Sequence, residues 1–122
     1  MKWILIFLGG GLGSVCRFAI SVLFKGMVSA FPLATFLSNL VAAFVIAVIF
    51  FIGNKLNNHV VWPLLAIGFC GGLSTFSAFS LETFHLLKSG QLGLALTYVF
   101  SSFVVCLLAV WLISKLAPEG NL

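Results

Sequence analysis

Apolar residues form four long runs along the chain, separated by short polar stretches. The runs cover about residues 3–24, 32–52, 61–87 and 92–116, and 62% of the 122 residues are hydrophobic. A helix needs about 20 residues to cross the hydrocarbon core of a bilayer. The pattern therefore predicts an all-α integral membrane protein, with a single domain of four transmembrane helices and no room for a soluble domain.

The third run is too long for one clean crossing, and its centre is the least lipid-like part of the chain. Gly68, Gly71 and Gly72 loosen the backbone there, and a series of hydroxyl residues follows. Non-helical backbone at membrane depth is tolerated only where protein or a water-filled cavity surrounds it. We therefore expect the third helix to break between Gly71 and Thr75, against protein or water.

The first run contains a stripe of small residues that ends in an arginine. Gly9, Gly13 and Arg17 are spaced by four, which places them on one face of a helix. The two glycines permit close approach of a second helix. A buried arginine costs about 2.5–3.5 kcal/mol on the insertion scale, so Arg17 is expected to face protein or water. Snorkelling to the interface is the alternative. The glycines favour a structural, protein-facing role, and the arginine itself adds positive electrostatic potential.

The second and fourth runs carry weaker polar stripes. Thr35 and Asn39 share a helix face in the second run. An asparagine at membrane depth either bridges two helices or lines a polar path, and the residue alone favours neither. Tyr98, Ser102 and Cys106 recur every four residues in the fourth run and form another stripe.

The charges indicate a membrane topology rather than a nucleic-acid partner. Only 7% of the residues are charged, and the lysines lie near the ends of the apolar runs, where lysines anchor helices. With four crossings, one side carries Lys2, Lys55 and Lys115, and the other carries Lys25 and Lys88. The two sides differ little in positive charge, so the preference for one orientation in the membrane is weak. Four helices also cannot easily enclose a polar path alone. Both points predict an antiparallel, dual-topology homodimer.

The polar side chains favour a narrow anion path over catalysis. No pair of carboxylates, nucleophile with its base, or metal-ligand spacing is present, so we expect no enzyme. Hydroxyls and amides donate hydrogen bonds, and aromatic ring edges carry partial positive charge. A cation path would need carboxylates at mid-depth, but Glu82 lies towards the end of the third run. A wide anion pore would need rings of Arg or Lys, which this chain lacks. The polar residues therefore favour a narrow anion path.

These residues resemble the small microbial fluoride channels called Fluc or CrcB proteins, over essentially the whole chain. The resemblance is carried by three motifs: Gly9-Gly10-x-x-Gly13-x-x-x-Arg17, Pro32-x-x-Thr35-x-x-x-Asn39, and Gly68-x-x-Gly71-Gly72-x-Ser74-Thr75-Phe76-Ser77-x-Phe79-Ser80-x-Glu82. The third motif is highly specific.

The resemblance implies antiparallel dimers with two fluoride pores and a sodium ion at the dimer centre. Phe76 and Phe79 would line the pores with their ring edges, and Asn39 would donate a hydrogen bond to fluoride. The backbone carbonyls of Gly71 and Ser74 would hold the structural Na⁺. The other pore positions implied in this way are Thr75, Ser77, Glu82, Tyr98 and Ser102.

The chain departs from the usual family pattern at a few positions. Ser74 and Ala78 stand where the family commonly has threonines, so Ala78 loses a hydroxyl. Ala42 and Ala47 stand where glycines are common in the second helix. Cys106 replaces a frequent hydroxyl on the fourth-helix stripe, which puts its membership of the polar track in question.

The predicted function is a passive, fluoride-selective channel that lets fluoride leave the cytoplasm and so relieves fluoride toxicity. Its expected location is the inner membrane of a bacterium or other microbe, with membrane lipid and a second copy as partners. The alternative is a small dual-topology, proton-coupled multidrug exporter, but that class needs a carboxylate in the first helix, where this chain has Arg17. A helical assembly factor is a third possibility, which does not explain the break.

Overall fold

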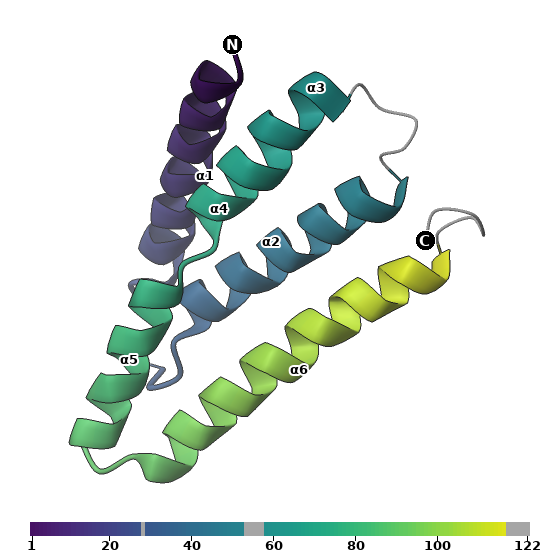
Figure 1. Ribbon diagram of the computed structural model, residues 1–122. Coiled ribbons are helices and arrows are strands. Elements are labelled where there is room, and N and C mark those ends of the chain that lie inside the picture. The colour runs from purple at the N-terminus through teal and green to yellow at the C-terminus, as the bar shows by residue number, and fades with distance from the viewer. Residues whose placement is uncertain (28, 53–57, 117–122) are drawn as a thin grey trace.

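The computed structural model describes residues 1–27, 29–52 and 58–116. Most of the expected second loop, with Lys55, and the C-terminal tail lie outside the described residues. The helices are α1 (Lys2–Phe24), α2 (Leu33–Ile52), α3 (Asn58–Val61), the π-helix η2 (Trp62–Phe69), α4 (Cys70–Leu73), α5 (Phe76–Lys88) and α6 (Leu92–Leu116) (Figure 1).

Four helical stretches are long and apolar enough to cross a membrane, which confirms the predicted all-helical membrane fold. The first, second and fourth are α1, α2 and α6, and the third runs from α3 through α5. The chain passes up and down between two ends (Figure 1). The starts of α1 and α3 lie at one end, and the start of α6 lies at the other with the end of α5.

The third crossing is bent, as predicted, because its helix stops and restarts near the middle. Ser74 (φ −78°, ψ 149°) and Thr75 (φ −150°, ψ 115°) have extended backbone between α4 and α5. Thr75 also caps α5, since its hydroxyl oxygen accepts a bond from the Ala78 N–H at 3.5 Å. The third crossing begins at Asn58 rather than at Val61, where the apolar run was expected to start.

The first helix packs along η2 and α4 through glycines on both sides. We call Gly9, Gly13, Gly68 and Gly72 the glycine seam. A Cβ added at Gly9 would overlap the Leu64 carbonyl oxygen, and one at Gly72 would overlap the Gly10 carbonyl oxygen. The two backbones therefore touch directly, which confirms the close approach predicted from Gly9 and Gly13.

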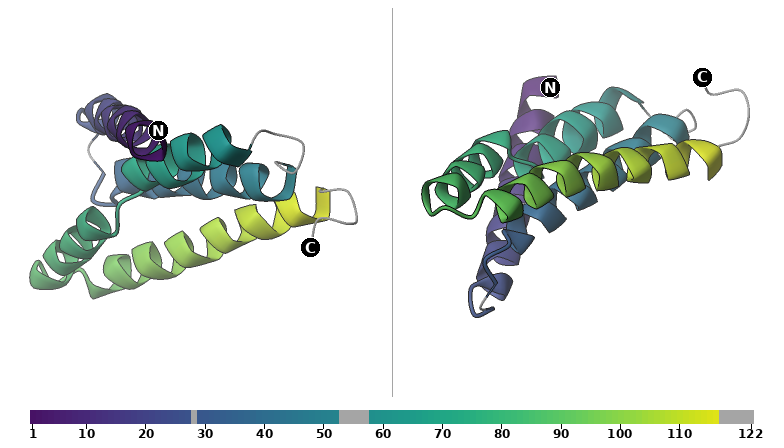
Figure 2. Two further views of the ribbon diagram at one scale, coloured as in Figure 1. Left: turned by 45° about the horizontal axis from the view of Figure 1, so that its top comes forward. Right: turned by 90° about the horizontal axis from the view of Figure 1, so that it is seen from below.

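On the other side of α2, the long helix α6 packs along α2 and also contacts α5. Figure 2 shows α6 running beside α2 and away from α1. A tight turn joins α5 to α6. Gly90 has a φ of 77° there, a conformation that glycine adopts without a steric penalty. The break, α2 and α6 thus come to surround one region, where the predicted pore residues lie.

Candidate functional site

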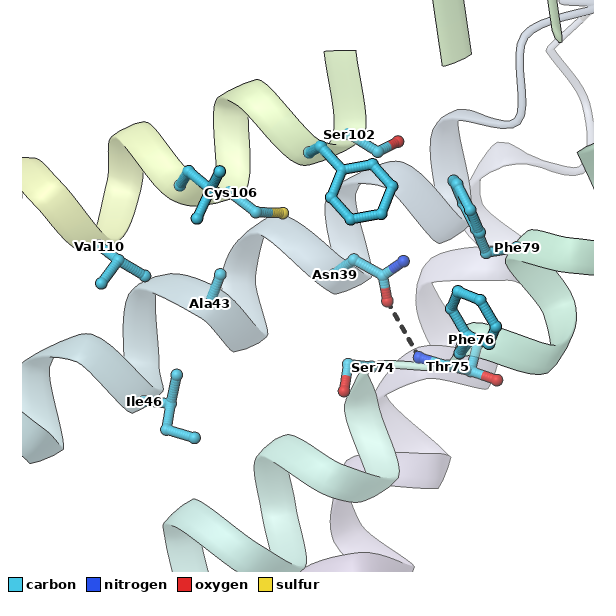
Figure 3. A pocket seen from close by; sticks show the side chains of 12 residues that line it. Asn39, Ala43, Ile46, Ser74, Thr75, Phe76, Phe79, Ser102, Cys106 and Val110 are labelled. Atoms are coloured by element: carbon cyan, nitrogen blue, oxygen red, sulfur yellow. Dashed lines mark hydrogen bonds between the residues drawn. The ribbon is translucent and has the colours of Figure 1, made fainter. Parts of the chain in front are cut away.

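A groove of about 360 Å³ lies between α2, the break and α6 (Figure 3). Its polar lining comes from Asn39 of α2, from Ser74 and Thr75 at the break, and from Ser102 of α6. Phe76 and Phe79 of α5 form its aromatic wall. The remaining lining residues are Ala43, Ile46, Phe103, Cys106, Leu107 and Val110. Among the described residues no charged side chain lines this groove.

Asn39 ties α2 to the break. The Thr75 N–H donates to Asn39 Oδ1 at 2.9 Å, the bond drawn dashed in Figure 3. In an unbroken helix this N–H would bond to the carbonyl of Gly71, four residues earlier. The amide side chain thus replaces a lost helical partner and holds the first backbone N–H on the α5 side of Ser74.

The two phenylalanines of α5 differ in exposure although they are neighbours. Their ring centroids are 5.9 Å apart. Phe79 is 9% exposed and Phe76 is 76% exposed. Phe79 packs on Tyr98 at 4.9 Å between centroids and meets the Phe103 ring nearly at right angles, at 88°. Phe79 is therefore held in place by its neighbours, whereas most of the Phe76 side chain is exposed at the edge of the groove.

Beyond Phe79, a carboxylate joins three helices. Glu82 lies one turn further along α5. Thr35 Oγ1 donates to Glu82 Oε1 at 2.7 Å, and the Tyr98 hydroxyl donates to Glu82 Oε2 at 2.8 Å. Tyr98 is fully buried and Thr35 is buried. We call Thr35, Glu82 and Tyr98 the carboxylate triad; it links α2, α5 and α6 at one point.

A second hollow of about 640 Å³ opens on the far side of the triad. Glu82, His85 and Lys88 line it from α5, with Pro32 at the start of α2. Glu82 therefore faces this hollow while Phe79, one turn earlier on α5, faces the groove. The order along the molecule is hollow, carboxylate triad, Phe79 and groove.

The break also leaves two carbonyl oxygens without their usual helical donors. The Gly71 carbonyl would pair with the Thr75 N–H, which bonds to Asn39 instead. The Ser74 carbonyl would pair with the Ala78 N–H, which points at Thr75 Oγ1. Gly71 is exposed, and a Cβ added there would meet nothing within 4 Å. Neither carbonyl therefore has its usual helical donor among the described residues.

The predicted site residues fall into several places. Asn39, Ser74, Thr75, Phe76, Phe79 and Ser102 meet in the groove, and Cys106 lies on its wall. Tyr98 and Glu82 belong to the triad, and the Ser77 hydroxyl lies 3.0 Å from Thr75 Oγ1 on the exposed side. Arg17 lies one turn beyond Gly13 on α1, half-buried and outside the groove lining.

Sequence reasoning missed Thr35 as a partner of Glu82, and Phe103 and Ala43 as part of the groove wall. Thr35 and Ala43 each lie four residues from Asn39 on the same face of α2, so the helix spacing was the available signal. For Phe103 we find no signal in the sequence, because its role depends on how α6 meets α5.

Comparison with known proteins agrees with this architecture. Residues 4–113 match the family described as CrcB-like protein, Camphor Resistance (CrcB). The chain is 45% identical over 115 residues to the "Fluoride-specific ion channel FluC" of Escherichia coli O17:K52:H18, covering 89% of this chain and 91% of the relative. Proteins of the same name from Escherichia coli K12 and Shigella boydii serotype 18 are 44% identical over the same shares.

Both the family match and the relatives span most of the chain, so the similarity covers all four crossings and the groove. The relatives are bacterial, and four helices here can cross a membrane. The protein is therefore a multi-pass protein of the bacterial inner membrane, and it belongs to the CrcB family.

Proposed function

We propose that the protein is a passive, fluoride-selective channel that lets fluoride leave the cytoplasm and so protects the cell from fluoride toxicity. The observation that carries the proposal is the groove, where an amide, hydroxyls and two phenylalanines meet at the break of the third helix without a charged side chain among the described residues. The names of the bacterial relatives support fluoride as the ion.

The groove favours a small anion for electrostatic reasons. An amide N–H donates hydrogen bonds to an anion, and a phenylalanine edge carries partial positive charge. Asn39, Phe76 and Phe79 offer these groups on one groove. A narrow path of this kind strips water from fluoride and replaces it with short contacts, and the larger chloride ion does not fit. Thr75, Ser77, Tyr98, Ser102 and Glu82 extend the same path.

The functional unit we propose is an antiparallel, dual-topology homodimer. Phe76 is 76% exposed, and the hydroxyl residues Ser77 and Ser80 are exposed on the same helix. Extended backbone at membrane depth needs protein or water around it rather than lipid. A second copy packed against the break would supply that cover and close the groove into a pore, two pores per dimer.

A structural Na⁺ at the dimer centre fits the free carbonyls of Gly71 and Ser74. Backbone carbonyls are established cation ligands in channels, and both carbonyls lack their helical donors here. Two inverted copies would contribute these carbonyls from opposite sides. When bound, the ion would join the two breaks electrostatically; fluoride would pass only along side chains of α2, α5 and α6.

The test is fluoride efflux from liposomes that contain the purified protein, followed with a fluoride-selective electrode. We expect rapid efflux down the fluoride gradient, without a proton gradient, and none from protein-free liposomes. Proton-driven efflux of a lipophilic cation without fluoride efflux would support the multidrug exporter instead. Chemical cross-linking of the same sample checks the dimer, and a solely monomeric protein with full activity would remove the dimer from the proposal.

A further inference from the structure

Asn39 has one end of its amide fixed by the break. A backbone N–H can only donate a hydrogen bond. The Thr75 N–H lies 2.9 Å from the Asn39 side chain, so the atom that faces it must be the carbonyl oxygen Oδ1. The NH₂ end must then point the other way. Figure 3 shows the Asn39 nitrogen turned away from Thr75, on the side of the groove.

Two serine hydroxyls of the groove donate their protons within their own helices, and the Thr75 hydroxyl pairs with the Ser77 hydroxyl at 3.0 Å. The Ser74 hydroxyl donates to the Cys70 carbonyl at 2.8 Å, and the Ser102 hydroxyl donates to the Tyr98 carbonyl at 2.6 Å. The Ser74 and Ser102 hydroxyls therefore present lone pairs rather than protons to the groove. Among the nitrogen and oxygen donors on side chains of the described groove residues, the Asn39 NH₂ group is the one without a hydrogen-bond partner.

We propose that the Thr75 N–H acts as an orientation lock on Asn39, and that the locked NH₂ group sets the preference of the groove for anions. This inference rests on the proposed fluoride conduction. A flipped amide would place Oδ1 in the groove beside the lone pairs of Ser74 and Ser102, and such a lining repels anions. Breaking the third helix therefore does more than expose backbone: its first freed N–H determines which end of Asn39 meets the ion.

Two substitutions separate the anchoring role of Asn39 from its donor role. Asn39→Asp keeps an acceptor for the Thr75 N–H but places an oxygen in the groove instead of NH₂. Asn39→Leu has a similar size and keeps neither group. Ser38→Ala is the matched control, because the Ser38 hydroxyl bonds to the Ala34 carbonyl of its own helix and does not line the groove.

The readouts are fluoride efflux from liposomes and hydrogen exchange of the Thr75 amide. We expect Asn39→Asp to reduce efflux by about 30-fold or more, with Thr75 exchange as slow as in the wild type. Asn39→Leu should lose efflux and also exchange faster at Thr75. Ser38→Ala should match the wild type in both. A merely structural bond to Thr75 predicts normal efflux from Asn39→Asp, which would overturn the proposal.

A measurement on the wild-type protein keeps the inference testable if either variant fails to fold. The side-chain ¹⁵N–¹H₂ signals of Asn39 should shift with added fluoride and stay unchanged with chloride. No shift with fluoride, or equal Thr75 exchange in the wild type and Asn39→Leu, would overturn the orientation lock. If the wild-type protein shows no fluoride efflux, the proposed function is wrong. The hydrogen exchange of the Thr75 amide would still show whether Asn39 anchors the break.

Discussion

The third crossing has two sides that are built in opposite ways. Its first half, η2 and α4, meets α1 along the glycine seam, where backbone touches backbone and no side chain intervenes. Its second half, α5, meets α2 and α6 through side chains that line the groove and form the carboxylate triad. The first contact leaves no space, whereas the second leaves a groove of about 360 Å³.

The two halves of the third crossing therefore have different roles. The glycine seam holds the start of the break in place, because neither backbone can move closer or slide without overlap. The side chains after the break can then be aimed by only a few hydrogen bonds, such as the bond from Thr75 to Asn39. Changes in the seam should therefore remove the folded protein, and changes in the groove should remove conduction while the fold stays intact.

The largest effect is expected from Gly13→Val. A Cβ at Gly13 would overlap the Phe69 carbonyl oxygen, and backbone cannot move aside as a flexible side chain can. Overpacking typically costs about 1–3 kcal/mol, and we expect at least the upper end here, seen as loss of the folded species in size-exclusion chromatography. Gly11→Val is the control, because a Cβ at Gly11 meets open space. A stable Gly13→Val protein would contradict the role of the seam.

Next in size is the loss of conduction from Phe79→Ile. The change removes an aromatic ring that lines the groove and keeps an apolar side chain. Fluoride efflux should fall about 100-fold, corresponding to about 2.7 kcal/mol, with an unchanged elution volume. Phe76→Ile should slow efflux as well while disturbing packing less, because Phe76 is exposed in the protomer. Phe84→Ile, an exposed position on α5 outside the groove, is the control.

A smaller effect is expected from Tyr98→Phe, which removes one of the two hydroxyl donors to Glu82. A protein hydrogen bond contributes about 0.5–1.5 kcal/mol, so we expect a lower thermal unfolding temperature and about tenfold slower efflux. Thr97→Val is the neighbouring control, since the Thr97 hydroxyl bonds only within α6, to the Gly93 carbonyl. Equal behaviour of the two variants would show that the triad is dispensable.

The smallest effect is expected from Cys106→Ser. The substitution places a hydroxyl on the groove wall, where the family often has one, with little change in size. Efflux should stay within about threefold of the wild type, measured at equal protein density in the same liposomes. A loss of efflux comparable to Phe79→Ile would mean that the thiol itself is needed for conduction.

Much of the fold was predictable because its causes are local. Apolar runs of the right length predict the four crossings, and glycines followed by hydroxyls predict the break, which falls at Ser74 and Thr75. The spacing of Gly9 and Gly13 predicts the close approach of a second helix. The π-helix η2 was not predicted, since an apolar run looks the same in either kind of turn.

The carboxylate triad and the partners of Asn39 were less accessible, because they depend on contacts between distant residues. Thr35 and Glu82 are 47 positions apart, so their bond requires the placement of α2 against α5. The sequence also left open whether Asn39 bridges helices or lines a path. The structure shows both arrangements at once, with Oδ1 bonded to Thr75 and the side chain on the groove.

The most direct test of the account is the initial rate of fluoride efflux against that of chloride, for the wild type and Phe79→Ile in matched liposomes. The account predicts fast fluoride efflux, negligible chloride efflux from the wild type, and a loss of the fluoride rate in the variant. Equal fluoride and chloride rates in the wild type, or an undiminished fluoride rate in Phe79→Ile, would contradict the assignment of the groove as the fluoride path.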